Sequence, residues 1–228
     1  MKHAGKAWLA GLKLVFLALV GVLAILAVAW LAQKVGAFVL TITWGLAAAW
    51  VLFTIFTFYF FRDPDARVPT GAGLVVAPAH GKVDAIGTTT ETRFMGGECQ
   101  RISIFLSVLD VHVQNAPVSG QVALCLHTPG QYLNAMRADS AEFNENFLIG
   151  IEASDPPRQK IGLRLIAGVL ARRIIPWVKP GDQIERGVRI SLIQFGSRAD
   201  VYLPKEARIK VKLGDRVVGG ETVLAAFE

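Results

Sequence analysis

Two long apolar segments open the chain, and neither carries a charged side chain. They cover residues 14–32 and 35–61, and only Gln33 and Lys34 separate them. As a helix, each could cross about 30 Å of hydrocarbon. The pattern predicts a membrane-anchoring hairpin of two transmembrane helices over residues 1–61. The first segment alone is also compatible with a signal peptide, but its apolar core is long and a second segment follows at once.

After residue 61 the pattern changes to short apolar runs divided by glycine and proline. Asp63-Pro64 ends the helical pattern, which places a domain boundary between residues 61 and 62. We therefore expect a mostly β (α+β) domain over residues 62–228. Residues 161–175 fit either a strand or a helix, and residues 131–146 are turn-rich with room for one short helix. The clearest strand signals cover residues 74–77, 82–86, 101–106, 111–113, 188–193 and 199–203.

A ten-residue pattern, V-K-x-G-D-x-[IV]-x-x-G, occurs at residues 178–187 and again at residues 211–220. Its Gly-Asp step favours a tight turn, because glycine tolerates positive φ and aspartate caps its own turn. Similar patterns occur in the flattened β-sandwich of biotinyl and lipoyl carriers, so we expect a related β-sandwich-like fold. Those carriers modify a lysine at an exposed hairpin, whereas the corresponding region here holds Gly196-Ser197. The repeat therefore favours the fold and argues against a carrier function.

The formal net charge of +6 comes mostly from the N-terminal segment. Residues 1–61 hold four lysines and no acidic residue, which leaves 20 basic and 18 acidic residues for the rest of the chain. A domain so close to neutral lacks the excess of basic residues that is typical of nucleic-acid-binding proteins. Three lysines precede the first apolar segment, and Arg62 and Arg67 follow the second. The positive-inside rule therefore predicts that both ends of the hairpin, and the domain that follows it, lie on the cytoplasmic side of the cell membrane. Cys99 and Cys125 lack metal-ligand spacing and are expected to be buried thiols.

The Gly196-Ser197 pair lies between the strand-like runs 188–193 and 199–203. Glycine lets the backbone twist, so the serine hydroxyl can approach the carbonyl of the preceding peptide bond and attack it. Most Gly-Ser pairs are plain turns, and the pair by itself is weak evidence. It becomes informative together with three segments, residues 77–83 (Ala-Pro-Ala-His-Gly-Lys-Val), 105–120 and 166–204.

In this order, these segments closely resemble the short bacterial form of phosphatidylserine decarboxylase. The resemblance covers nearly all of residues 60–228 and includes Phe60-Phe61-Arg62-Asp63-Pro64 and Asn144-Glu145-Asn146. It implies a precursor that cleaves itself between Gly196 and Ser197. The products would be a large chain of residues 1–196 and a small chain of residues 197–228, paired as a heterodimer. In this chemistry the Ser197 hydroxyl attacks the Gly196 carbonyl to form an ester, elimination leaves dehydroalanine, and hydrolysis converts it to a pyruvoyl group.

The implied pyruvoyl cofactor supplies a carbonyl, which no natural side chain offers. The amine of the phospholipid substrate, phosphatidylserine, forms a Schiff base with it, and the imine takes up the electrons released as CO₂ leaves. Protonation and hydrolysis then release phosphatidylethanolamine. The resemblance thus implies a membrane-bound enzyme of phospholipid biosynthesis.

Four residues have expected roles in this chemistry. Ser197 is the nucleophile and cofactor precursor, and His112 is the general base or acid, because its reference pKa of about 6.5 suits proton transfer at neutral pH. Without the motif, His112 would be interpreted as a half-buried strand histidine. Asp110 would share a strand face with His112 and orient it, or would only start the strand. His80 replaces the aspartate that usually assists self-cleavage in the family, and Asn115 stands where many members have histidine or arginine.

Three other functions fit the sequence less well. A serine hydrolase would need Gly-x-Ser-x-Gly around its nucleophile, and positions 195 and 199 are Phe and Ala. A metalloenzyme would need a ligand spacing that the four histidines do not show. The alternative from a different class is a non-enzymatic, membrane-anchored β-sandwich carrier or adaptor. It predicts one intact polypeptide, whereas the decarboxylase predicts two fragments.

Overall fold

A computed structural model describes residues 6–132, 143–168, 173–194 and 197–227 of the chain. The chain divides into two compact units, Met1–Thr57 and Phe58–Glu228. The short helix for which residues 131–146 have room falls largely outside the described residues. Gly196, on the N-terminal side of the predicted cleavage site, also lies outside them.

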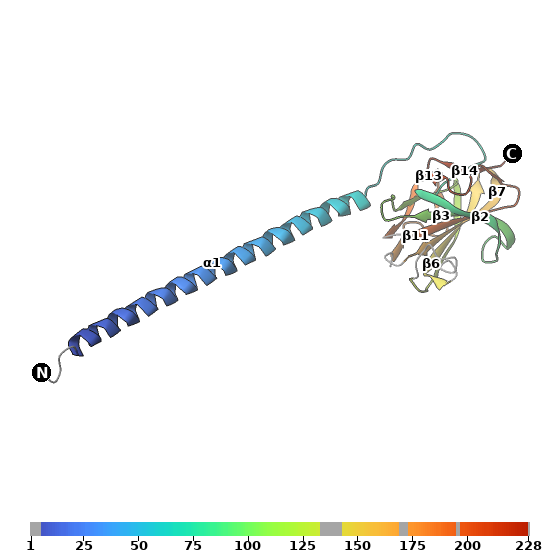
Figure 1. The fold of residues 1–228 in the computed structure, drawn as a ribbon. Coiled ribbons are helices and arrows are strands. Elements are labelled where there is room, and N and C mark those ends of the chain that lie inside the picture. The colour runs from blue at the N-terminus through green and yellow to red at the C-terminus, as the bar shows by residue number, and fades with distance from the viewer. Residues whose placement is uncertain (1–5, 133–142, 169–172, 195–196, 228) are drawn as a thin grey trace. The chain divides into compact units, whose positions relative to one another are not determined.

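The N-terminal unit is a single helix, and the predicted two-helix hairpin is wrong. Helix α1 runs without interruption over Lys6–Phe60, as Figure 1 shows. The expected turn does not form, because Gln33 and Lys34 are both good helix formers and no proline interrupts the segment. Within α1, residues 16–60 are long and apolar enough to cross a membrane, and large apolar side chains such as Trp44 are exposed. An exposed apolar surface of this extent is typical of a membrane-anchoring segment.

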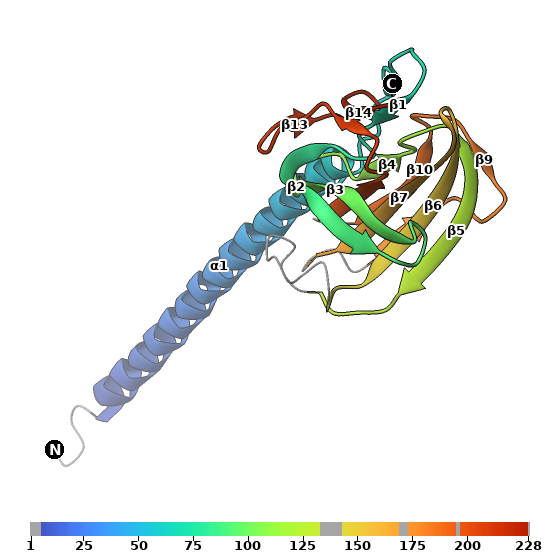
Figure 2. The same ribbon diagram turned by 90° about the vertical axis from the view of Figure 1, so that its right-hand side faces the viewer.

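The second unit is built from short antiparallel strands, so the predicted mostly β domain is confirmed. An eight-stranded sheet has the order β13-β2-β3-β11-β7-β6-β5-β9, and two three-stranded sheets have the orders β1-β14-β12 and β4-β10-β8. Figure 2 shows the strong curl of the large sheet. The strands are β1 Leu74–Val76, β2 Gly81–Glu91, β3 Gly97–Leu106, β4 Val113–Asn115, β5 Gly120–Thr128, β6 Asn146–Ser154, β7 Pro157–Ala167, β8 Arg173–Pro176, β9 Gln183–Ile184, β10 Arg189–Gln194, β11 Ser197–Leu203, β12 Arg208–Ile209, β13 Arg216–Val217 and β14 Val223–Ala226.

Strand β11 lies at the centre of the large sheet, between β3 and β7. Ala199, Val201 and Leu203 alternate along it and are fully buried in the main apolar core. This period-2 pattern is the reason the strand could be predicted from the sequence. The register places Ser197 opposite Leu106 of β3 and Ala167 of β7. The first residue of β11 therefore has a backbone position defined from both sides.

The two copies of the Gly-Asp pattern form the predicted tight turns. Gly181 and Gly214 have φ values of 97° and 92°, which only glycine adopts without strain. The carboxylates of Asp182 and Asp215 each accept the backbone N–H three residues earlier, at 2.9 and 2.8 Å. Short strands follow the turns and pair with the large sheet, β9 with β5 and β13 with β2. The likeness to carrier sandwiches itself stays a prediction.

Candidate active site

A tight turn after β3 starts one residue beyond Leu106, the register partner of Ser197. The Asp110 N–H donates to the Ser107 carbonyl at 3.0 Å. The Asp110 carboxylate accepts from the Ser107 N–H at 2.9 Å and from its hydroxyl at 2.7 Å. These bonds favour a turn over an extended backbone. The strand predicted at residues 111–113 therefore begins only at Val113.

His112 follows this turn and is only 1% exposed. Its Nδ1 lies 2.8 Å from the Asp110 carbonyl oxygen. A carbonyl only accepts, so Nδ1 carries the proton of the neutral ring and Nε2 is its proton-accepting nitrogen. Burial lowers the pKa of His112 from 6.5 to about 4, although the Asp110 carbonyl and charge raise it. At neutral pH, His112 is therefore an uncharged base.

Asp110 contacts His112, but not through the group that was predicted. We expected the carboxylate to share a strand face with the imidazole, whereas the backbone carbonyl makes the contact. The carboxylate instead closes the turn, and its Oδ1 lies 3.2 Å from Arg216 Nη1. The alternative interpretation, in which Asp110 serves mainly through its turn preference, matches this geometry better.

Phe60 packs on the ring of His112, a contact that the sequence analysis missed. The ring centroids are 4.1 Å apart with an angle of 30° between the planes, and Phe60 is fully buried. The only sequence signal for this contact was that the family resemblance includes Phe60-Phe61-Arg62-Asp63-Pro64. The next basic residue also holds the turn, since Arg62 Nη2 donates to the Leu109 carbonyl at 2.7 Å. The residues after Thr57 thus form one wall of the histidine site.

Polar contacts fix the backbone on the other side of His112. Its carbonyl accepts the Ile193 N–H at 3.1 Å and the Gln114 side-chain amide at 2.6 Å. The Ser191 hydroxyl in turn donates to Gln114 Oε1 at 2.8 Å. All of Gln114 and Ser191 is buried. This network ties the histidine to β10, which ends shortly before Ser197 along the chain.

His80 lies in the loop between β1 and β2 and is half-buried. Burial lowers its pKa below the ordinary value of 6.5, and Arg62 acts in the same direction. The charge of Asp110 has the opposite effect and raises it. Because Asp110 and Arg62 also act on His112, the two histidines share one electrostatic environment. His80 is therefore mainly neutral at pH 7 and has the chemistry of a proton acceptor.

Asn115 connects the His80 loop to the two repeat copies. Its backbone N–H donates to the Pro78 carbonyl at 2.8 Å, and its side-chain amide donates to the Gly187 carbonyl at 2.8 Å. A Cβ added at Gly219 would lie 2.9 Å from Asn115 Oδ1 and 3.0 Å from His80 Cδ2, so these groups are packed closely together. Asn115 therefore has a structural role where a histidine or arginine was expected from the resemblance.

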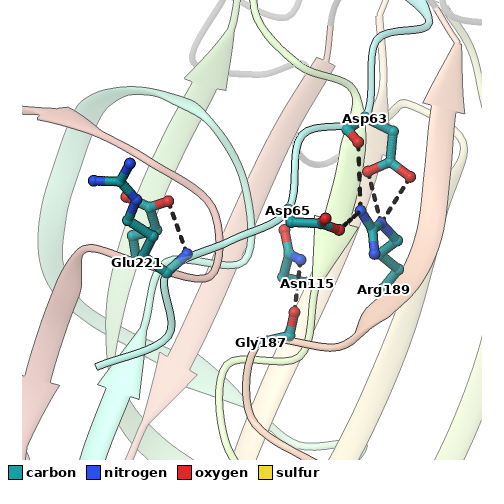
Figure 3. A network of polar contacts seen from close by, with 7 residues as sticks. Asp63, Asp65, Asn115, Gly187, Arg189 and Glu221 are labelled. Carbon is teal, nitrogen blue, oxygen red and sulfur yellow. Dashed lines mark hydrogen bonds and ion pairs between the residues drawn. The ribbon is translucent and has the colours of Figure 1, made fainter. Parts of the chain in front are cut away.

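Figure 3 shows how the segment after α1 is held beside Asn115. The Arg189 side chain makes ion pairs with Asp63 at 2.7 Å and with Asp65 at 2.8 Å. The Glu221 carboxylate accepts the Arg67 N–H at 2.9 Å. Arg189 belongs to β10, and Glu221 directly follows the second repeat copy. They keep the connecting segment against the same region that holds both histidines.

The backbone of Ser197 forms the start of β11. Its strand partner Leu106 leads into the turn of Asp110, and the nearby end of β10 is hydrogen-bonded to His112. The fold thus brings the start of β11, the neutral histidine and the His80 loop into one region. A serine at a strand end, after a glycine and near a neutral buried base, defines a candidate self-processing site.

Comparison with known proteins identifies the family. The sequence profile of the family named "Phosphatidylserine decarboxylase" matches residues 53–225. The chain is 43% identical over 179 residues to the phosphatidylserine decarboxylase proenzyme of Desulfotalea psychrophila, covering 78% of this chain and 83% of that protein. The proenzyme of Symbiobacterium thermophilum is 41% identical over 185 residues, with 81% and 85% covered. The chain therefore belongs to the phosphatidylserine decarboxylase family.

Proposed function

We propose that this protein is a membrane-anchored proenzyme that decarboxylates phosphatidylserine to phosphatidylethanolamine with a pyruvoyl group made from Ser197. Family membership supports the reaction. The observation that carries the assignment to this site is the geometry of His112. It is a buried neutral base, and its backbone is hydrogen-bonded to the strand that leads to Gly196-Ser197.

Maturation begins with attack of the Ser197 hydroxyl on the Gly196 carbonyl. It divides the chain into residues 1–196 and 197–228. The fit to a pyruvoyl group is supported by two features, a serine after glycine as its precursor and a first β11 residue held between β3 and β7. His80 accepts the hydroxyl proton, because its lowered pKa keeps the imidazole neutral.

When present, the pyruvoyl group supplies the carbonyl that takes up the electrons released as CO₂ leaves. The protein's residues position the substrate and move the protons. His112 accepts a proton at Nε2 from the substrate amine and donates it to the carbon that loses CO₂, while the Asp110 carbonyl keeps the Nδ1 proton in place. The buried rings of Phe60 and His112 exclude water from this proton transfer.

Residues 1–61 anchor the enzyme, and residues 62–228 carry the chemistry. We place the catalytic domain on the cytoplasmic side of the cell membrane. Because α1 is continuous, it is not a hairpin whose two ends lie on the same side of the membrane. Support comes from Cys99 and Cys125, which are both free thiols, as is usual in a reducing compartment.

Replacement of Ser197 by alanine tests the proposal. Wild-type protein should give two fragments on a denaturing gel, with intact masses for residues 1–196 and for a small chain that starts with a pyruvoyl group. Ser197→Ala should stay as one chain and lose all decarboxylation, because no hydroxyl remains. Ser154→Ala, at an exposed serine at the end of β6, is the control and should cleave normally. A single intact wild-type chain without activity would support the adaptor function instead.

A further inference from the structure

Arg198, the residue directly after Ser197, forms a partly buried ion pair that the proposed chemistry does not use. It is 8% exposed, and its Nη2 contacts Asp84 Oδ2. Among the described residues, the buried Arg198 Nε and Asp84 Oδ1 have no hydrogen-bond partner. The pair is therefore a single contact and not a bidentate fork.

Asp84 reaches Arg198 because β2 is irregular at this point. Arg198 and Lys82 are both register partners of Phe105, so the ion pair extends across β3 from β11 to β2. The register of β2 against β3 shifts between Val83 and Ala85, which leaves Asp84 as the extra residue of a β-bulge. Bulges redirect a side chain and are frequent next to active sites. The bulge here directs a carboxylate to the residue next to the cleavage site.

Cleavage would change what holds residue 197. In the precursor, the chain continues on both sides of this residue. After cleavage between residues 196 and 197, residue 197 becomes a chain terminus that is held by its strand pairing with β3 and β7 and no longer by residue 196, and termini lose order unless they are tied down. Arg198 then carries the first side chain of the small chain, and Asp84 belongs to the large chain. Their ion pair would connect the two chains one residue from the new terminus.

We propose that the Arg198–Asp84 ion pair positions residue 197 in the mature enzyme, so that both are positioning residues for decarboxylation. The inference rests on the proposed function. It predicts an asymmetry between the two reactions of the protein. Self-cleavage takes place in a continuous chain and depends little on the pair. Decarboxylation takes place at a chain terminus and depends on it strongly.

The test compares Arg198→Met with wild type in three measurements. The rate of precursor loss should change by less than about threefold, whereas kcat per cleaved molecule should fall about 10- to 100-fold, as expected when a reacting group is misplaced by an ångström or so. Hydrogen exchange at the Ala199 amide of the mature enzyme should be faster. Arg198→Lys should recover part of kcat, since one charged contact suffices.

Lys205 and Glu98 provide the matched control. This ion pair also joins the small chain to the large chain, but it is exposed (57% and 56%) and lies beyond the far end of β11. Lys205→Met should leave cleavage, kcat and exchange unchanged. If Arg198→Met does not fold, the double variant Asp84→Asn with Arg198→Met removes both charges and should show the same loss of kcat.

The outcomes separate the inference from the proposed function. A wild-type chain that neither cleaves nor decarboxylates would overturn both. A wild type that cleaves and is active, with Arg198→Met retaining its kcat, would overturn the positioning role alone. An equal loss of cleavage and kcat would also overturn it, because the ion pair would then serve general stability.

Discussion

The two copies of the ten-residue pattern are built alike and used differently. Residues 178–187 dock on residues 116–122, and residues 211–220 dock on residues 77–83. In each copy the first glycine donates its N–H to a valine carbonyl at 2.8 Å, and that valine donates back to the aspartate carbonyl at 2.9 Å. The last glycine donates to an alanine carbonyl, at 2.8 and 2.7 Å. The docked segments also share the sequence A-P-x-x-G-x-V.

The difference lies in the side chains at equivalent positions. In one copy, the Ser119 hydroxyl accepts the Arg186 N–H at 2.9 Å, and the Arg186 guanidinium donates to three backbone carbonyls before and at the start of β1. In the other copy, His80 occupies the place of Ser119, and Gly219 occupies the place of Arg186. One scaffold thus serves as a structural clamp in one copy and presents a titratable side chain in the other.

The largest expected difference between the copies comes from replacing His80 or its equivalent, Ser119, by alanine. His80→Ala should slow self-cleavage about 100-fold or more, because a positioned general base contributes at least that factor. Ser119→Ala should cleave at the wild-type rate and lose about 1 kcal/mol of unfolding free energy, the contribution of one hydrogen bond. Time courses of precursor loss and chemical denaturation measure these effects. A His80→Ala precursor that matures normally would leave His112 as the maturation base.

The pH dependence of cleavage sharpens the same comparison. A base works when it is neutral, and burial lowers the pKa of His80 below 6.5. The wild-type rate should therefore decline as the pH falls, with its inflection below pH 6.5, as the imidazole becomes protonated. His80→Asp should mature and lose this inflection, since a carboxylate titrates at a different pH. An inflection at or above 6.5 would contradict the assignment.

An intermediate effect on cleavage is expected at the second pair of equivalent positions, Gly219 and Arg186. Gly219→Ala would bring a Cβ to within 2.9 Å of Asn115 Oδ1 and 3.0 Å of His80 Cδ2, so both side chains must shift. Cleavage should slow about 10-fold, because small displacements of a reacting group are costly. Arg186→Ala should instead leave cleavage unchanged and reduce stability by about 2 kcal/mol through its lost hydrogen bonds. Equal cleavage defects in both variants would show that the copies do not differ in function.

The smallest expected effect is on the unfolding free energy, and it tests whether the Gly-Asp turns of the two copies are equivalent. Asp182→Ala and Asp215→Ala each remove one carboxylate that accepts a backbone N–H in an exposed turn. Each should lower the unfolding free energy by about 1 kcal/mol, with no change in cleavage or decarboxylation. Thermal unfolding of the two variants side by side is the measurement. A loss of cleavage in Asp215→Ala alone would mean that its turn also positions His80.

Local patterns in the sequence were sufficient for much of the fold. Alternating apolar residues predicted β3 and β11, and the Gly-Asp steps predicted both tight turns, because strand period and glycine conformation are properties of neighbouring residues. The hairpin prediction failed for a related reason. Gln33-Lys34 interrupts the apolar character of the segment, but it does not interrupt the backbone hydrogen bonding of a helix.

The candidate site depends on contacts between distant parts of the chain. The Gly196-Ser197 pair, His112 and His80 were predicted from residue chemistry and family resemblance. The packing of Phe60 on His112 and the use of the Asp110 carbonyl were not. An apolar residue such as Phe60, at the end of a long apolar helix, is equally compatible with lipid or with a protein core, and only packing distinguishes them. The same packing removes water from His112 and lowers its pKa to about 4, a shift that burial causes and local sequence does not encode.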